Sequence, residues 1–227
     1  FINPLIQRKA YIWWNFPVTD FSNDRILMGE VFGIDPSIRT EVSAFISNPM
    51  VYAEASKLAL FSVANYTWNI NAYDAKASWL EGIRSLLPDA AEAFACFCRH
   101  SSATGTDHFP RPESECIRRA ADRFVKQYTQ SGNWQAEDMQ TLKDEFDRMA
   151  LAANELRLAE SNLALTREID PWITAFGLWA QMGQEVLALT EAATENAPKA
   201  FDYALKRIGL LKQLLEKNNQ ETRPASI

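Results

Sequence analysis

The sequence has few cysteines, no excess of positive charge and no long apolar segment. Its three cysteines among 227 residues are too few, and odd in number, to form a disulfide framework. The net charge is −6 and no Lys/Arg stripe with interleaved aromatics is present, which argues against a nucleic-acid-binding surface. No apolar run reaches the roughly 20 residues that are needed to span a bilayer.

Signatures of several enzyme classes are missing as well. The chain has no Gly-x-Gly-x-x-Gly motif, no Walker loop and no Gly-x-Ser-x-Gly elbow. Cys96-x-Cys98-x-His100 suggests a metal motif, but on a helix only Cys96 and His100 share a face. No second cluster in the sequence supplies the remaining ligands. We therefore predict neither a metal site nor a cofactor, and interpret these residues as buried thiols and a helix-end histidine.

Residues 11–20, Tyr-Ile-Trp-Trp-Asn-Phe-Pro-Val-Thr-Asp, contain the clearest candidate site. Aromatic and β-branched residues predict a strand, which Pro17 ends before Asp20. In a strand, Tyr11, Trp13 and Asn15 face one way and the apolar residues between them face the other. A parallel barrel strand has this pattern where its C-terminal end opens onto a sugar pocket. The alternative is a buried edge strand whose Asn15 caps a turn.

Beyond this strand the sequence predicts helices, over residues 49–68, 74–87, 88–99, 113–130, 134–166, 171–195 and 198–219. Short connections predict that the later helices pack antiparallel as a bundle. Residues 101–112 are rich in turn formers and predict a boundary. We therefore expect two domains, 1–108 and 109–227.

We find no partner downstream for the strand near residue 11, and one strand alone cannot form a sheet. The chain also starts Phe-Ile-Asn-Pro rather than with Met. We therefore expect it to be the C-terminal part of a longer protein, cut within a β/α domain.

Asn48 and Asp20 each have two interpretations. Ser47-Asn-Pro49 is a typical helix start, with Asn48 as the cap and Pro49 at the first helical position. Alternatively, the Asn48 amide could donate and accept hydrogen bonds with a sugar hydroxyl at a barrel mouth. Asp20 is either a turn residue or a carboxylate that accepts hydrogen bonds from two hydroxyls.

Five sequence segments carry a resemblance to a known family. They are 11–20 as quoted, Leu-Met-Gly-Glu-Val-Phe-Gly at 27–33, Phe-Ile-Ser-Asn-Pro-Met at 45–50, Glu-Ala-Ser-Lys at 54–57 and Val-Ala-Asn-Tyr-Thr-Trp-Asn at 63–69. The chain resembles the end of the catalytic barrel of glycoside hydrolase family 84. These are β-N-acetylglucosaminidases that include bacterial O-GlcNAcase homologues, often called hyaluronidase-like. The resemblance implies a mainly α fold: the last strand and helices of a (β/α)8 barrel, followed by a helical bundle.

The resemblance also implies roles for four residues. Trp13 would line the pocket around the acetamido group, and Asn15, Asp20 and Asn48 would hydrogen-bond to the sugar, with Asp20 reaching the 4- and 6-hydroxyls. The implied mechanism is retaining and substrate-assisted, and it uses two adjacent aspartates. This sequence contains no Asp-Asp pair. The family places that pair upstream of residue 1, so we expect this segment alone to be inactive.

The implied partners are a glycan or glycoprotein that bears N-acetylglucosamine, and the missing N-terminal portion of the barrel. A bacterial family member would be secreted or periplasmic. The alternative function is a non-catalytic helical module for binding or oligomerisation.

Overall fold

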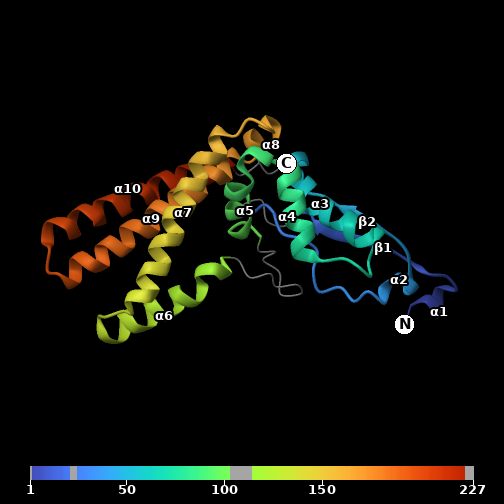
Figure 1. Cartoon of the computed structure of the whole chain (residues 1–227), viewed down its shortest axis with the longest axis horizontal. Coiled ribbons are helices and arrows are strands. Elements are labelled where there is room, and N and C mark those ends of the chain that lie inside the picture. Colours follow the sequence, from blue (N-terminus) through green and yellow to red (C-terminus); the bar gives the residue numbers. More distant parts are fainter. Residues whose placement is uncertain (1, 21–24, 103–113, 223–227) are drawn as a thin grey trace.

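The computed structural model describes residues 2–20, 25–102 and 114–222. A pair of strands lies at one end with α3 and α4, α5 lies in the middle, and α7, α9 and α10 extend to the other end (Figure 1). The elements are α1 (Asn3–Ile6), β1 (Ala10–Pro17), α2 (Ile38–Glu41), β2 (Val42–Asn48), α3 (Ala53–Trp68), α4 (Ala75–Leu86), the 3-10 turn η1 (Pro88–Ala90), α5 (Ala91–Arg99), α6 (Glu115–Ser131), α7 (Ala136–Leu158), α8 (Leu163–Glu168), α9 (Asp170–Thr194) and α10 (Pro198–Thr222).

The strand β1 has a partner, so the prediction that none lies downstream is wrong. β1 and β2 pair in parallel, with Trp13 opposite Ile46 and Pro17 opposite Asn48. A parallel pair needs a long crossover and therefore leaves no hairpin signal in the sequence. The strand β2 also mixes serines with apolar residues, and its last residues resemble a helix start. These two features explain why the sequence did not reveal it.

The predicted alternation of side chains along β1 is confirmed. Tyr11 and Trp13 are 60% and 65% exposed on one face. On the other face, the Trp14 ring lies 5.6 Å from that of Phe45 and 6.1 Å from that of Tyr66, between ring centroids. The strand pair is therefore fixed against α3 by aromatic packing on one side, and its other side remains accessible.

The helix predicted to start at Pro49 begins four residues later, at Ala53, and Asn48 is the last residue of β2. The prediction that Asn48 caps this helix is therefore wrong. A carboxylate from α8 bonds the helix start instead: the backbone N–H of Ala55 donates to Glu168 Oε2 at 2.7 Å. A carboxylate is stabilised at a helix N-terminus. Because Glu168 is 113 residues away, no local pattern could indicate it.

The helix predicted over 134–166 is two helices, α7 and α8. The Asp89 carboxylate accepts hydrogen bonds from the backbone N–H groups of Glu160 and Ser161, at 2.8 and 2.9 Å. The Ser161 hydroxyl also donates to this carboxylate. That bond, and then the backbone bonds, lower the pKa of Asp89. Asn162 then caps α8 by accepting from the N–H of Leu165 at 3.1 Å. The break is thus stabilised both locally and by the distant 3-10 turn η1.

One hydrophobic core connects the strand end of the molecule with the helical bundle. Its central element is α5, where residues 93–98 are all buried. The core includes Leu58 on the side of α3 and Leu156 on the side of α7. The rings of Phe97 and Phe176 meet edge to face at 5.5 Å, which adds α9 to the same core. The position of the strands relative to the bundle is therefore set by apolar packing around α5.

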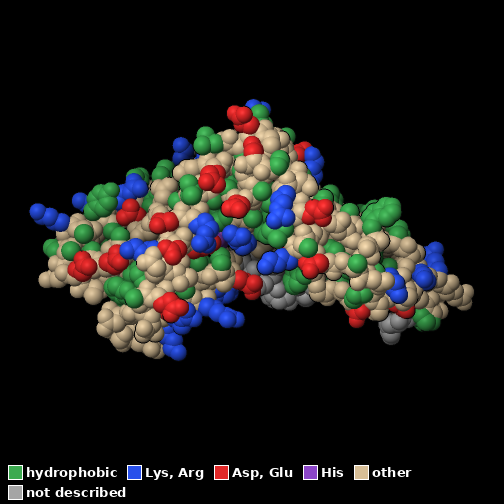
Figure 2. All heavy atoms as spheres, viewed as in Figure 1, with side chains coloured by type: hydrophobic (Ala, Val, Ile, Leu, Met, Phe, Trp, Pro, Cys, Tyr) green, Lys and Arg blue, Asp and Glu red, His purple; other side chains and the backbone are tan. Residues whose placement is uncertain are grey.

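Charged side chains of both signs lie on the face of the molecule that Figure 2 presents. Figure 2 shows Lys/Arg and Asp/Glu side chains intermixed over the face of the bundle that it presents. Of the helices in the described ranges, none combines the length and hydrophobicity that a membrane span needs.

Two glycines on the bundle helices allow a matched test of packing. A methyl group at Gly183 would lie 2.5 Å from atoms of the Phe146 ring, whereas one at Gly209 meets no atom within 4 Å. We expect Gly183→Ala to destabilise the fold by about 1–3 kcal/mol through overpacking. Gly209→Ala should stabilise it by ~0.5–1 kcal/mol through helix propensity. Denaturant unfolding measures both, and stabilisation by both would contradict close packing of α7 on α9.

A second pair of variants tests which residue stabilises the start of α3. Glu168→Ala removes the acceptor at the helix start and should cost about 1 kcal/mol of unfolding free energy. Asn48→Ala removes only a partly exposed side-chain hydrogen bond, so its cost should stay within ~0.5 kcal/mol. Thermal and denaturant unfolding compare the two, and a larger loss for Asn48→Ala would contradict the assignment of the helix-start contact to Glu168.

Candidate functional site

Three of the four predicted site residues meet at the C-terminal end of the parallel strand pair. The indole Nε1–H of Trp13 donates to Asn15 Oδ1 at 2.9 Å. The Asn48 side-chain amide donates to the same oxygen at 3.2 Å. Since parallel strands end at the same edge of a sheet, β1 and β2 bring these side chains together.

The hydrogen bonds among the described residues leave the Asn15 amino group and the Asn48 side-chain oxygen for a ligand. Asn15 Oδ1 is used twice, and its Nδ2 amide makes no bond within the described residues. The same holds for Asn48 Oδ1. The two amides can therefore donate to and accept from one neighbouring hydroxyl or amide group. Trp13 lies beside them with 65% of its surface exposed, and its ring offers an apolar face.

The backbone that carries these residues is firmly held. The Ser47 hydroxyl donates to the Phe16 carbonyl and links the ends of the two strands. Behind them, the buried segment of Ile26, Leu27 and Met28 is fixed by the Trp79 Nε1–H, which donates to the Met28 carbonyl at 2.8 Å. Contacts within the chain therefore hold the backbone at this edge.

Asp20 is the one predicted residue that the structure does not bring into this group. It is exposed and lies in the loop that follows β1, directly before residues 21–24, which are outside the described ranges. Within the described part of the chain, no hydrogen bond joins Asp20 to Trp13, Asn15 or Asn48. Its role in the site stays a prediction.

Two amides and an indole can bind a polar ligand, but they cannot transfer protons near neutral pH. No carboxylate or imidazole takes part in the hydrogen bonds of this group among the residues described. The arrangement therefore suits recognition and needs acid–base groups from elsewhere for catalysis.

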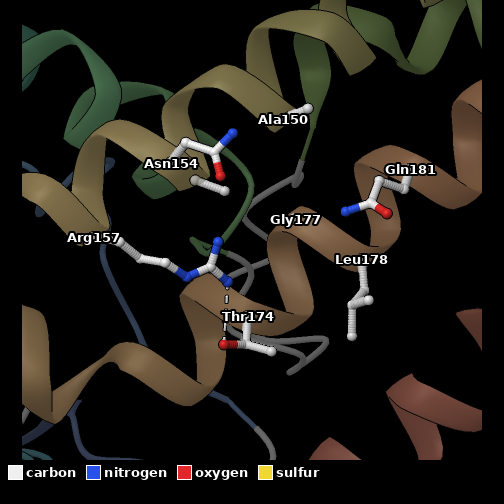
Figure 3. A pocket seen from close by; sticks show the side chains of 8 residues that line it. Ala150, Asn154, Arg157, Thr174, Gly177, Leu178 and Gln181 are labelled. Carbon is white, nitrogen blue, oxygen red and sulfur yellow. Dashed lines mark hydrogen bonds between the residues drawn. The ribbon is translucent and has the colours of Figure 1, made fainter.

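A concavity between α7 and α9 is a weaker candidate. Figure 3 shows Asn154 and Arg157 on one helix facing Thr174 and Gln181 on the other. Arg157 donates to the Thr174 hydroxyl at 3.3 Å. The cavity volume is about 110 Å³, below the ~300 Å³ at the lower end of ligand pockets. It suits a few water molecules better than a sugar ring.

Comparison with known families gives two matches that follow each other along the chain. Residues 1–99 match the family model described as beta-N-acetylglucosaminidase. Residues 113–224 match the model described as the post-catalytic domain of bacterial GH84 proteins.

Solved structures show the same fold. The protein titled CpGH84B is 28% identical with a TM-score of 0.87, over 96% of this chain and 38% of that one. CpGH84D is 26% identical with a TM-score of 0.79, over 95% of this chain and 36% of that one. An O-GlcNAc hydrolase of Thermobaculum terrenum, in mutant form, shares the fold at 22% identity, with a TM-score of 0.76 over 99% of this chain and 50% of that one.

The chain thus spans half or less of the length of these solved structures. The matches confirm the resemblance drawn from the sequence, and they confirm a mainly α fold in which the end of a barrel is followed by a helical bundle. On the two family matches and these structural neighbours, the chain belongs to glycoside hydrolase family 84.

Proposed function

We propose that the chain contributes sugar-binding residues to a retaining, substrate-assisted β-N-acetylglucosaminidase. The enzyme removes terminal, O-GlcNAc-type N-acetylglucosamine from a glycan or glycoprotein. The observation that carries this proposal is the meeting of Trp13, Asn15 and Asn48 at the C-terminal edge of the strand pair. That edge lies within residues 1–99, which match the glucosaminidase family model.

Each residue has a role that suits its chemistry. The exposed face of the Trp13 indole packs against the methyl group of the substrate acetamide. The Asn15 amino group and the Asn48 side-chain oxygen hydrogen-bond to the sugar. The Asp20 carboxylate accepts hydrogen bonds from the 4- and 6-hydroxyls, and charged acceptors form the stronger bonds of this kind.

The substrate provides its own nucleophile in this mechanism. The acetamido oxygen attacks the anomeric carbon as the glycosidic bond breaks, giving an oxazoline that water later opens. One aspartate orients the acetamide, and the other protonates the leaving oxygen and then deprotonates the water. Since this sequence has no adjacent aspartates, the pair comes from barrel strands beyond these 227 residues.

The strand pair is suited to joining such a barrel. In a two-stranded sheet each strand has one edge that no other strand of the sheet covers, and those backbone groups can pair with further strands. The side chains of Tyr11 and Ile46 on this pair are 60% and 40% exposed, so other barrel residues can pack against them. The proposed partner is therefore the N-terminal portion of the barrel.

The 227-residue chain alone should show no measurable hydrolysis of an aryl N-acetylglucosaminide. Each acid–base group contributes about 10²–10⁴-fold to the rate, and neither is present. The control is a longer protein that includes the rest of the barrel, in the same assay. Turnover by the rigorously purified chain would mean that other carboxylates within it perform the chemistry.

In the longer enzyme, Asp20→Ala should lower kcat/KM by an amount equivalent to about 2–4 kcal/mol, because two substrate hydroxyls lose a charged acceptor. Asn48→Ser should keep the thermal midpoint and still lower kcat/KM, because a hydroxyl is too short to replace the amide. Asp202→Ala on α10 is the matched control, since Asp202 is exposed and distant in sequence. A kcat/KM within about threefold of wild type would leave Asp20 as a turn residue.

A further inference from the structure

Four side chains with metal-binding chemistry meet where α5, α6 and α7 come together. Cys96 lies on α5, His100 at its C-terminal end, Cys116 on α6 and Glu145 on α7. His100 Nε2 is 3.0 Å from Glu145 Oε1. Cys116 Sγ is 3.3 Å from the same oxygen and 3.8 Å from His100 Nε2. The ligand atoms of Cys96, His100 and Glu145 all lie within 4.8 Å of one another.

The contacts around this cluster orient its ligand atoms inward. The Ser114 hydroxyl lies 2.7 Å from His100 Nδ1, so the other ring nitrogen, Nε2, faces the thiols. Arg148 pairs with Glu145 Oε2, which leaves Oε1 facing the same point. Metal-binding histidines and carboxylates are held in this way by their outer neighbours. The side chains of His100 and Glu145 are both only 3% exposed.

We propose that Cys96, His100, Cys116 and Glu145 bind one divalent cation of the zinc class. Zinc takes four such ligands, at about 2.0–2.3 Å, so neighbouring ligand atoms stand about 3.3–3.8 Å apart. The separations among His100, Glu145 and Cys116 are 3.0, 3.3 and 3.8 Å, within tenths of an ångström of that range. Cys96 Sγ lies within 4.8 Å of the His100 and Glu145 ligand atoms and moves inward on binding. Two thiolates and a carboxylate bring three negative charges. A divalent cation together with Arg148 offsets them.

A hydrogen-bonded network without metal is the alternative arrangement. Thiols are weak hydrogen-bond donors and acceptors, so two of them add little to a His–Glu pair. Thiolates are, by contrast, preferred zinc ligands. The choice of cysteine at both positions therefore favours the metal, and the experiments below distinguish the two.

An ion has a route to the cluster, and its binding would link the two family segments. Cys116 is exposed and lines a cleft of about 480 Å³ together with Arg99 and Glu115. Cys96 lies at the end of residues 1–99, which match the glucosaminidase model, and His100 directly follows them. Cys116 and Glu145 lie in residues 113–224, which match the post-catalytic domain. A bound cation would thus join α5 to α6 and α7 as a structural site.

Cobalt is a spectroscopic probe for this proposal. The 227-residue chain, stripped with a chelator and dialysed, is titrated with Co²⁺ and then with Zn²⁺. We expect one equivalent of Co²⁺, visible bands of tetrahedral cobalt, a thiolate-to-cobalt charge-transfer band, and loss of these bands as Zn²⁺ displaces cobalt. Uptake without the thiolate band, or no stoichiometric uptake, would overturn the proposal and leave a hydrogen-bonded network.

Alkylation gives a second readout that needs no variant. Cys116 is exposed, and mass spectrometry can follow its reaction with iodoacetamide in the stripped chain. Zn²⁺ should slow that reaction at least tenfold and raise the thermal midpoint as its concentration rises. Equal rates with and without Zn²⁺ would overturn the proposal.

A matched pair of cysteine variants identifies the ligands. Cys96→Ala and Cys98→Ala remove the same atoms from neighbouring positions of α5, and both cysteines are buried. Only Cys96 belongs to the cluster. We expect Cys96→Ala to weaken Co²⁺ binding at least 100-fold and Cys98→Ala to leave it unchanged. Equal binding by the two variants would place the ion elsewhere on the chain and overturn the assignment.

Discussion

The burial of α5 is the constraint on which the rest of the structure depends. Six consecutive helical residues cover the whole circumference of a helix, and residues 93–98 are all buried. Such a helix must be enclosed on every side, by the strand end of the molecule and by the bundle together. The core that surrounds it runs from Leu58 to Phe176 without interruption. Neither half can rotate relative to the other without exposing α5.

This enclosure also explains the two long-range contacts that end or begin helices. With α5 fixed between the halves, α8 lies next to the start of α3, and Glu168 reaches the backbone of Ala55. The 3-10 turn η1 leads directly into α5 and places Asp89 within hydrogen-bond distance of the backbone after α7. Both carboxylates satisfy backbone donors that would otherwise lack partners. Apolar packing brings the segments together, and these polar contacts then define where each helix ends.

The sequence predicted what depends on local pattern. Alternation in β1 placed Trp13 and Asn15 on one face. Helical periodicity located the starts of α6, α7, α9 and α10 to within a few residues, but it did not show the break between α7 and α8. It failed where a contact comes from far along the chain. The strand β2 was missed because its strand partner, β1, lies across a parallel crossover. The cap remained one of two interpretations of Asn48 because no local pattern indicates that Glu168 bonds the start of α3. The same limit hid the cluster around His100, whose Glu145 lies 45 residues away.

The proposed separation of binding residues from acid–base residues follows from how a parallel barrel is built. Each strand contributes only one or two side chains at its C-terminal end, so a complete site needs several strands. A substrate that supplies its own nucleophile reduces the protein's task to orientation and proton transfer. Orientation requires rigid donors and acceptors, and the shared oxygen of Asn15 supplies that rigidity by fixing Trp13 and Asn48 to one point. The packing of Trp14 against Phe45 and Tyr66 then holds the proposed sugar-binding edge against α3.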